Sequence, residues 1–211
     1  MTEDEAKAWL TETLNVSRET LDRLEAFAAA VVEENAHQNL VSAATIPQLW
    51  ARHIVDSAQL LTFDVPHDSS PWLDLGTGAG FPGLVIAILS PRPMILVESR
   101  RKRIEFLSDQ VESLGLKHVS VHGGRLETLA APLVGVISAR AFAPLPKLLA
   151  LAHRFSRKET IWLLPKGRTA REELESARAS WQGVFHVKPS LTDAEAAIIV
   201  ATGINPRKSA R

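Results

Sequence analysis

Three glycines between two acidic residues form the clearest candidate for chemistry in this chain. They alternate with other residues directly after a short apolar stretch, at Gly76, Gly78 and Gly80. Asp74 precedes them, and Glu98 ends the next apolar stretch. Glycines let the backbone turn sharply and let a ligand approach the main chain, and an acid at the end of a second strand accepts hydrogen bonds from ribose hydroxyls. The pattern therefore predicts a binding site for a cofactor that contains a ribose.

The same spacing matches the fingerprint of dinucleotide-binding enzymes, which is the first alternative. Gly78, Gly80 and Gly83 fit Gly-x-Gly-x-x-Gly. Glu98 follows at the distance that the fingerprint requires. That loop binds a pyrophosphate at a bare helix N-terminus, whereas Asp74 favours a cationic ligand group. The chain also offers no second domain for a hydride acceptor, so an NAD-type oxidoreductase is the weaker interpretation.

Short apolar runs alternate with helical stretches on both sides of this loop. The runs that we predict as strands are 72–75, 94–98, 119–122, 134–139, 160–164, 184–188 and 197–202. Helical spacing covers 83–89, 100–114, 144–154 and 168–181. This alternation indicates parallel βαβ units in a doubly wound α/β sheet. The last two strands have only a short segment between them, which predicts an antiparallel hairpin.

The first 62 residues differ because their apolar residues recur at helical spacing throughout. Ser17 is the expected N-cap of one helix, and Pro47 stands where another can begin. The segment 64–71 has the composition of a linker. We therefore predict an N-terminal helical extension over residues 1–66, followed by an α/β domain over 67–211.

Composition excludes several other classes of protein. The chain has 211 residues, 45% of them apolar and 23% charged, as in a globular domain. The absence of cysteine excludes disulfides, zinc–thiolate sites and a cysteine nucleophile, and the histidines lack metal spacing, so we expect no metal. The polar, acidic first ten residues and the lack of an apolar run of about 18 residues predict neither a signal peptide nor a membrane span. We expect a cytoplasmic monomer.

Charge is balanced overall but unevenly distributed. Lys plus Arg and Asp plus Glu each number 24. Acids dominate residues 1–45, whereas residues 140–171 carry eight bases and one acid. A further basic cluster occupies 100–103. These bases form either a face that binds phosphates or ordinary solvated helix surfaces.

The segment from Asp74 to Gly80, Asp-Leu-Gly-Thr-Gly-Ala-Gly, with Glu98 after it resembles the class I S-adenosylmethionine-dependent methyltransferases. In that family the acidic loop and its glycines hold the amino-acid and sulfonium end of the cofactor, and the later acid holds its ribose. The resemblance implies a Rossmann-like, mostly parallel seven-stranded sheet, here with the N-terminal helical extension.

Further segments extend the resemblance over nearly the whole chain. In order they are Asn39–Ser42, Arg52–Ser57, Gly76–Gly83, Lys102-Arg103, Phe106-Leu107, Ser138–Leu145 and Lys166-Gly167. Together they are similar to the ribosomal small-subunit methyltransferase G family. The resemblance implies a bacterial enzyme that transfers a methyl group from S-adenosylmethionine to N7 of one guanine, guanine 527 in the family's naming, in the 530 loop of 16S rRNA. Its partner would be the small ribosomal subunit or an assembly intermediate.

The resemblance also assigns roles to individual positions. It implies cofactor contacts at Gly76, Phe81, Leu126, Glu127 and Arg140, and general methyltransferase logic adds Asp74, Gly78, Gly80 and Glu98. Substrate and RNA contacts are expected at Asn39, Arg52, His53, Arg100, Arg101, Arg103, Lys147 and Lys166. The plainer alternatives are a first-turn helix acid for Glu127, a core residue for His53 and a turn lysine for Lys166.

Guanine N7 has a free lone pair and no proton, so its methylation needs no general base. Catalysis then depends on placing N7 in line with the methyl group and the sulfur. The catalytic candidates are Arg140, Lys166 and Asp56, the last as a carboxylate near the cationic product base, a role for which Asp74 is the alternative. Arg52 and Asp56 stand four residues apart, so a simple helix ion pair is the alternative for them. Tyrosine is absent, so a base would have to stack on Phe81, Phe142 or a tryptophan.

The chain departs from the family pattern at three positions. Glu34, Gln38 and Gly135 stand where relatives usually have a tryptophan, an aromatic residue and an aspartate. Two other interpretations also stay open. One is a small-molecule methyltransferase of the same fold, which the basic stretch 140–171 opposes. The other is a nucleotide-binding module that transfers nothing.

Overall fold

A single mixed sheet organises the molecule. The computed structural model describes residues 1–66, 68–130 and 132–207, which form seven strands in the order β3-β2-β1-β4-β5-β7-β6. Every neighbouring pair is parallel except the two that β7 makes, with β5 and with β6. The predicted sheet and its closing antiparallel hairpin are confirmed. The strands are β1 (Trp72–Leu75), β2 (Met94–Glu98), β3 (Val119–Gly123), β4 (Val134–Ala139), β5 (Ser156–Lys166), β6 (Trp181–Pro189) and β7 (Ala197–Pro206).

Helices connect the strands and precede the sheet. The α-helices are α1 (Glu3–Leu14), α2 (Arg18–Glu34), α3 (Asp56–Ala58), α4 (Gly83–Leu89), α5 (Arg101–Ser113), α6 (Leu145–Ala152) and α7 (Ala170–Arg178). Short 3-10 turns are η1 (Ala43–Gln48), η3 (Gln59–Thr62), η4 (Leu126–Thr128) and η5 (His153–Phe155), and η2 (Trp50–Val55) is a π-helical turn. None of the helices in the described ranges is long and apolar enough to cross a membrane.

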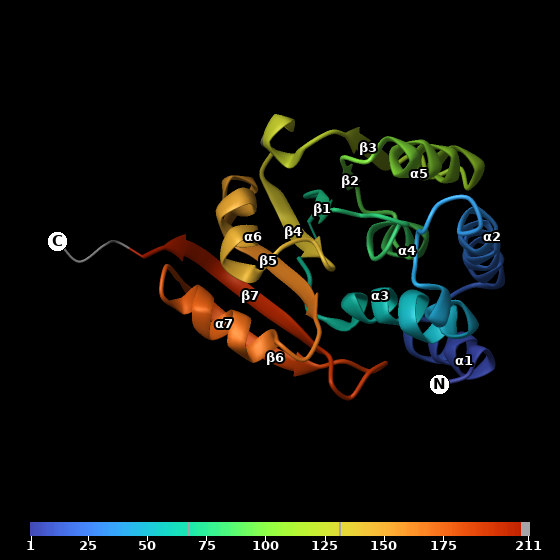
Figure 1. Ribbon diagram of the computed structural model, residues 1–211, viewed down its shortest axis with the longest axis horizontal. Coiled ribbons are helices and arrows are strands. Elements are labelled where there is room, and N and C mark those ends of the chain that lie inside the picture. The colour runs from blue at the N-terminus through green and yellow to red at the C-terminus, as the bar shows by residue number, and fades with distance from the viewer. Residues whose placement is uncertain (67, 131, 208–211) are drawn as a thin grey trace.

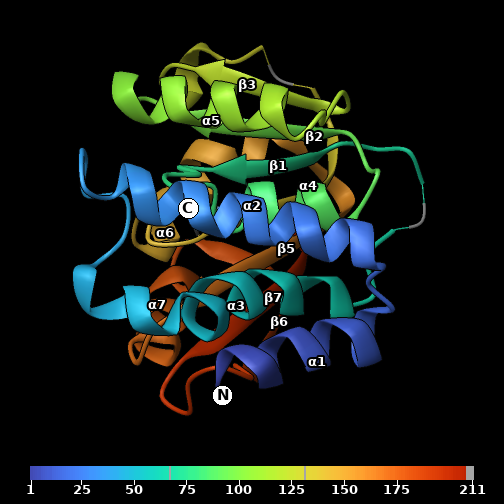
Figure 2. The ribbon, with the colours of Figure 1, turned by 90° about the vertical axis from the view of Figure 1, so that its right-hand side faces the viewer.

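The sheet lies between two helical layers. In Figure 1, α6 and α7 lie on one side of it, and α4, α5 and the N-terminal helices lie on the other. Figure 2 looks from this second side and shows α5, α2, α3 and α1 in front of the strands. Because both faces are covered, β1 and β4 are buried along their whole length, as central parallel strands are.

The N-terminal helices share an apolar core with the sheet. Phe27 of α2 contacts Phe81, with ring centroids 5.4 Å apart, and one buried cluster joins α1, α2 and η2 to α4. The predicted α/β domain begins at His67, which lies outside the described residues, as do 208–211 at its end. The division at this point stays a prediction.

Local signals in the sequence set only some element ends. The Ser17 side chain accepts a hydrogen bond from the backbone N–H of Thr20 at 3.2 Å, as a predicted N-cap should. Pro47 is the exception. It lies inside the 3-10 turn η1 and does not open a helix, because the chain enters the helical stretch earlier, at Ala43. Strand β5 begins four residues before the predicted 160, since Ser156 still pairs with Val134 across a bulge.

The tight packing of Gly83 at the start of α4 gives a stability test. A Cβ on Gly83 would meet Leu96 and lie 2.7 Å from Asp74 Oδ2, whereas a Cβ on Gly167 would meet nothing within 4 Å. We predict that Gly83→Ala lowers the free energy of unfolding by about 1–3 kcal/mol through overpacking. Gly167→Ala, the control, should change it by less than about 0.5 kcal/mol. Urea denaturation measures both, and equal effects of the two changes would contradict this packing.

Candidate functional site

The glycine loop after β1 reaches across to the end of β2. Gly76 and Gly78 have φ of +64° and +62°, a left-handed conformation that favours glycine. The Thr77 N–H donates to the Val97 carbonyl at 3.1 Å, and the Gly78 N–H donates to Glu98 Oε2 at 3.0 Å. The loop therefore turns so that its backbone faces the acid that follows the second strand.

Glu98 is a nearly buried carboxylate with an unused hydrogen-bond acceptor site. It is 5% exposed, and besides Gly78 it accepts from the backbone N–H groups of Ser99, at 2.7 Å, and Arg100, at 2.9 Å. Arg103 Nη1 lies 3.9 Å from the same carboxylate. Two carboxylate oxygens offer about four acceptor sites, so Glu98 can accept a further hydrogen bond from a ligand hydroxyl.

Asp74 is turned into the protein. It has no exposed surface, its Oδ1 accepts from Ser138 Oγ at 2.6 Å, and its Oδ2 accepts from the Gly83 N–H at 3.1 Å. Burial raises the pKa of Asp74 to about 6, against the lowering effect of these hydrogen bonds. The sequence predicts that Asp74 faces a cationic ligand group. In the structure its oxygens instead join β1 to β4 and to the start of α4.

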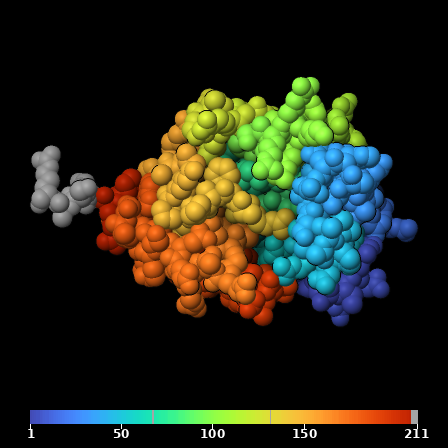
Figure 3. Space-filling view, in the orientation of Figure 1, coloured from blue at the N-terminus to red at the C-terminus, as the bar shows by residue number. Residues whose placement is uncertain are grey.

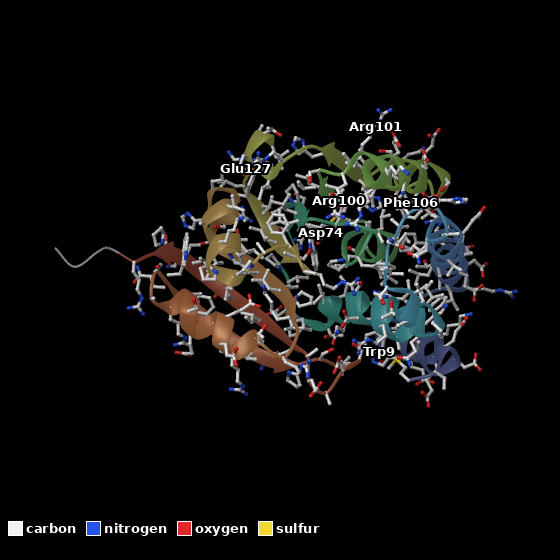
Figure 4. The ribbon with its side chains drawn as sticks, in the orientation of Figure 1. Trp9, Asp74, Arg100, Arg101, Phe106 and Glu127 are labelled. Atoms are coloured by element: carbon white, nitrogen blue, oxygen red, sulfur yellow. The ribbon has the colours of Figure 1, made fainter. Side chains whose placement is uncertain are left out.

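A cavity of about 350 Å³ opens between the glycine loop, the end of β2 and the turn η4. We call it the loop cavity. Four predicted cofactor contacts line it: Gly76, Glu98, Leu126 and Glu127. Leu126 is buried, and its carbonyl accepts from Arg154 at 2.7 Å. Glu127 is exposed at the rim, where it lies in Figure 4. Its own backbone N–H, and then Arg125, lower the pKa of Glu127.

The other predicted cofactor contacts lie outside the lining of this cavity. Gly78 bonds to Glu98 at its edge, and Gly80 packs against Phe27. Phe81 is 3% exposed and stacks on His53, with ring centroids 5.0 Å apart. Arg140 lies in a neighbouring cavity. The role of Phe81 that fits the structure is therefore to support the residues around it.

A second cavity, of about 580 Å³, brings together all three predicted catalytic residues. We call it the arginine cavity. Its lining includes Arg52, His53, Asp56, Arg140 and Lys166, contributed by η2, α3, β5 and the chain after β4. The seam between the N-terminal helices and the carboxyl ends of β4 and β5 thus holds a dense group of charges. Carboxyl ends of parallel strands are the usual position of ligand sites in such sheets.

Arg140 is the centre of this group. Its side chain is 22% exposed and donates to Asp56 Oδ2 at 3.2 Å, to His53 Nδ1 at 3.0 Å and to the Arg52 carbonyl at 3.3 Å. Burial lowers the pKa of Arg140, and Asp56 opposes that shift. The guanidinium also lies over the Phe81 ring, 5.2 Å from its centroid. Arg140 is held in one orientation from several sides.

His53 is a neutral link in this network. Burial, followed by the charges of Arg140 and Arg52, lowers the pKa of His53 to about 3. Because Nδ1 accepts from Arg140, Nε2 carries the proton and donates to Thr45 Oγ1 at 2.8 Å. The Thr45 hydroxyl in turn donates to the Ser42 carbonyl at 2.7 Å. His53 therefore orients Arg140 and does not act as an acid or base near neutral pH.

The loop between β6 and β7 completes the cavity with residues that the sequence did not single out. Asp56 Oδ1 accepts from Thr192 Oγ1 at 2.9 Å, and Arg52 pairs with Asp193 at 2.7 Å. The alternative of an Arg52–Asp56 helix pair is therefore wrong, because each residue has a better-placed partner on another element. No local pattern around 190–193 indicated this role, since the contacts span more than 130 residues of sequence.

Lys166 is placed in the wall of the arginine cavity. Its side chain is 8% exposed, and its Nζ donates to the Ala143 carbonyl at 3.0 Å and to Glu173 Oε2 at 2.8 Å. Glu173 also accepts from the Leu145 N–H at 2.9 Å. Lys166 and Glu173 together fix the chain that follows Arg140.

The two cavities share one wall. Ala141, Phe142 and Ala143 line both of them. Ala141 has φ of +52°, a left-handed conformation that costs a non-glycine residue about 1–2 kcal/mol. The tethers on Arg140 and Ala143 hold the segment in this turn. Figure 3 shows the hollow on this face, between the gold chain after β4 and the blue N-terminal helices.

Several predicted RNA contacts lie together away from the arginine cavity. Asn39 and residues 100–103 line a shallow hollow at the start of α5, where Arg103 Nη2 donates to the Asn39 carbonyl at 3.3 Å. Arg100 and Arg101 are exposed, and Arg101 projects outward in Figure 4. Lys147 is exposed at the rim of the loop cavity. Asn39 does not lie with Arg52 and His53, because the chain after α2 directs it toward α5.

The three departures from the family pattern have local explanations. Gln38 donates to Glu34 at 2.8 Å and to the Lys102 carbonyl at 3.1 Å, so these two residues join α2 to α5. A Cβ on Gly135 would lie 2.9 Å from Ser70 Cβ, so the close passage of the chain before β1 requires glycine there.

Among the described residues, no three His, Asp or Glu side chains are grouped so that they could hold a metal.

Comparison with known proteins identifies close relatives. Residues 20–197 match the family model described as rRNA small subunit methyltransferase G. The chain is 51% identical to the ribosomal RNA small subunit methyltransferase G of Zymomonas mobilis, covering 99% of this chain and 97% of that protein. It is 54% identical to the protein of the same name from Rhizorhabdus wittichii, covering 98% and 95%.

Solved structures support the same fold at low sequence identity. A glycopeptide N-methyltransferase complexed with S-adenosylmethionine has a TM-score of 0.60 at 8% identity and covers 71% of this chain and 86% of its own. An O-methyltransferase from Bacillus cereus, in complex with S-adenosylhomocysteine, has a TM-score of 0.59 at 15% identity and covers 92% and 96%. Both are methyltransferases, so the predicted class I methyltransferase fold is confirmed.

The burial of Asp74 predicts a pH dependence of stability. Its pKa is about 6 in the folded chain and near 3.8 when unfolded. The folded state therefore binds the Asp74 proton more tightly than the unfolded state does. This proton binding adds to the free energy of unfolding below pH 4, and the contribution is lost as pH rises through 6. At about 1.4 kcal/mol per pKa unit, the loss is roughly 3 kcal/mol. We predict that Asp74→Asn gains stability relative to the wild type by up to that amount between pH 4 and 7.

Urea denaturation across this pH range measures the difference. Asp109→Asn, which removes an exposed carboxylate from α5, is the matched control. A difference between Asp74→Asn and the wild type that stays constant from pH 4 to pH 7 would contradict the burial of a charged Asp74.

Proposed function

This chain belongs to the rRNA small subunit methyltransferase G family, and on that premise we propose that it transfers a methyl group from S-adenosylmethionine to N7 of a single guanine in the 530 loop of 16S rRNA. The observation that carries the proposal is the shared wall of the two cavities. A polar cavity beside the glycine loop adjoins a charged cavity at the same sheet edge, and residues 141–143 line both of them. Two molecules bound side by side could exchange a small group there.

The loop cavity suits the cofactor. Glu98 has spare acceptor capacity for a ribose hydroxyl, and the buried Leu126 side chain offers an apolar surface to an adenine ring. The volume, about 350 Å³, is at the lower end for small-molecule sites. When bound, S-adenosylmethionine supplies a methyl group on a positively charged sulfur. The residues that would hold it are Gly76, Glu98, Leu126 and Glu127.

The arginine cavity suits the guanine. In the transfer, the N7 lone pair forms the new N–C bond while the C–S bond breaks and its electron pair stays on sulfur, so no proton moves. The chain accordingly needs to orient N7 and not to remove a proton. Arg140, fixed by Asp56 and His53, presents N–H donors into this cavity and can bond guanine O6, the acceptor next to N7.

Basic side chains at the rim of the loop cavity and beside it would hold the RNA backbone. Arg100, Arg101, Arg103 and Lys147 lie near the mouth of the loop cavity and around the start of α5. Phosphate contacts of this kind position an RNA without reading its sequence. We propose the small ribosomal subunit or its assembly intermediate, in the cytoplasm, as the partner.

The proposal is tested by transfer from labelled S-adenosylmethionine. The purified protein is incubated with small subunits from cells that lack this gene, and the label is mapped in the RNA. Label at N7 of one guanine in the 530 loop is the expected result. Label elsewhere in the rRNA, or transfer to small molecules only, would overturn it.

Two variants separate the roles of the cavities. We predict that Glu98→Gln weakens S-adenosylhomocysteine binding at least about tenfold, because an amide nitrogen cannot accept the bonds that the carboxylate accepts from backbone N–H groups. Lys166→Ala should leave cofactor affinity within about threefold and reduce methylation at least tenfold, since it loosens the chain after Arg140.

Calorimetry and initial rates measure these effects. Glu105→Gln and Lys117→Ala change exposed residues outside both cavities and serve as controls. Unchanged cofactor affinity in Glu98→Gln, or a cofactor defect in Lys166→Ala as large as its loss of activity, would contradict the assignment of the two cavities.

A further inference from the structure

Phe142 lies in the wall that the two cavities share. Among the residues that the structure describes, it is the only phenylalanine or tryptophan that lines either cavity, and it lines both. The other ring in the lining, His53, is stacked on Phe81 and has both ring nitrogens hydrogen-bonded. The side chain is half-buried. Its ring lies against the glycine loop, because a Cβ on Gly76 would be 2.6 Å from Phe142 Cδ2. The ring therefore stands where the contents of the two cavities would meet.

The other aromatic residues near the site are already engaged. Phe81 is 3% exposed and packs between Phe27 and His53. Trp50 is buried beneath Lys7, whose Nζ lies 4.7 Å from the ring centroid. Neither ring has a free face toward the arginine cavity. A planar ligand in that cavity has Phe142 as the aromatic surface within reach.

The backbone on both sides of Phe142 is fixed. Arg140 is tied to Asp56 and His53, and the Ala143 carbonyl accepts from Lys166. Between these tethers, Ala141 adopts its left-handed turn. The segment thus presents one ring from a rigid support, which is how binding sites hold a stacking surface in place.

We propose that Phe142 is the stacking surface for the target base, which it holds face-on while Arg140 contacts the edge of the base. The inference rests on the proposed function and names the residue that positions the acceptor. Unpaired RNA bases are recognised by stacking on aromatic side chains together with hydrogen bonds to their edges. Stacking on Phe142 would restrict a purine to one plane, so that its N7 approaches the loop cavity in a single orientation.

The test uses Phe142→Leu, which keeps an apolar side chain of similar bulk, and Phe142→Tyr, which keeps the ring. Single-turnover methylation is measured at saturating small subunits, and S-adenosylhomocysteine affinity is measured by calorimetry. We expect Phe142→Leu to slow transfer by about tenfold to a hundredfold, a factor comparable to the contribution that base–aromatic stacking makes to binding. Cofactor affinity should stay within about threefold, and Phe142→Tyr should restore the rate.

A second readout does not depend on transfer. A short single-stranded RNA with the fluorescent purine 2-aminopurine is bound to the S-adenosylhomocysteine complex. Stacking should quench its fluorescence in the wild type and in Phe142→Tyr but not in Phe142→Leu. Phe185→Leu, which alters a ring of β6 under Arg178 and outside both cavities, is the matched control.

The outcomes separate this inference from the proposed function. A transfer rate of Phe142→Leu within twofold of the wild-type rate would overturn the stacking role. Equal quenching of the probe by the wild type and by Phe142→Leu would also overturn it. A loss of cofactor affinity as large as the loss of rate would also overturn it, since the ring would then cover the cofactor and not the base. Wild-type protein that quenches the probe but methylates no rRNA would instead contradict the proposed function.

Discussion

The guanidinium of Arg140 joins parts of the molecule that lie far apart in the sequence, and the rest of the site depends on it. It follows β4 and donates to Asp56 and His53, which come from the helices that precede the sheet. A guanidinium presents its N–H donors in one rigid plane, so it fixes the relative orientation of its partners. The N-terminal helices are therefore a structural part of the arginine cavity.

The two acidic residues at this edge of the sheet have different roles: Asp74 supports the fold of the glycine loop, and Glu98 faces the loop cavity. Asp74 is fully buried and connects β1, β4 and α4, so it gives the glycine loop its shape. Glu98 faces the loop cavity with acceptor capacity to spare. Arg140 and Lys166, on the other side of the shared wall, hold both ends of the segment that separates the two cavities. A methyl transfer to a lone pair needs placement and no proton transfer, and a rigid wall between two sites provides placement.

Local pattern was enough to predict the sheet and the glycine loop, whereas the family resemblance singled out the residues that line the arginine cavity. Apolar runs identify strands because burial on both faces leaves few polar positions, and carboxyl ends of parallel strands necessarily share one edge. The partners of Arg52 and Asp56 could not be predicted, because Asp193 and Thr192 reach them only through the closing hairpin. The inward orientation of Asp74 was equally hidden. An acid before a glycine loop has the same sequence whether its oxygens face a ligand or a neighbouring strand.

The arrangement of the two cavities is tested most directly by a crystal structure with S-adenosylhomocysteine bound. We predict that its ribose lies beside Glu98, that its adenine lies against Leu126, and that its sulfur points toward the wall formed by residues 141–143. The arginine cavity should then remain open to a base. S-adenosylhomocysteine bound within the arginine cavity, or bound with its ribose away from Glu98, would contradict the division between cofactor and acceptor sites.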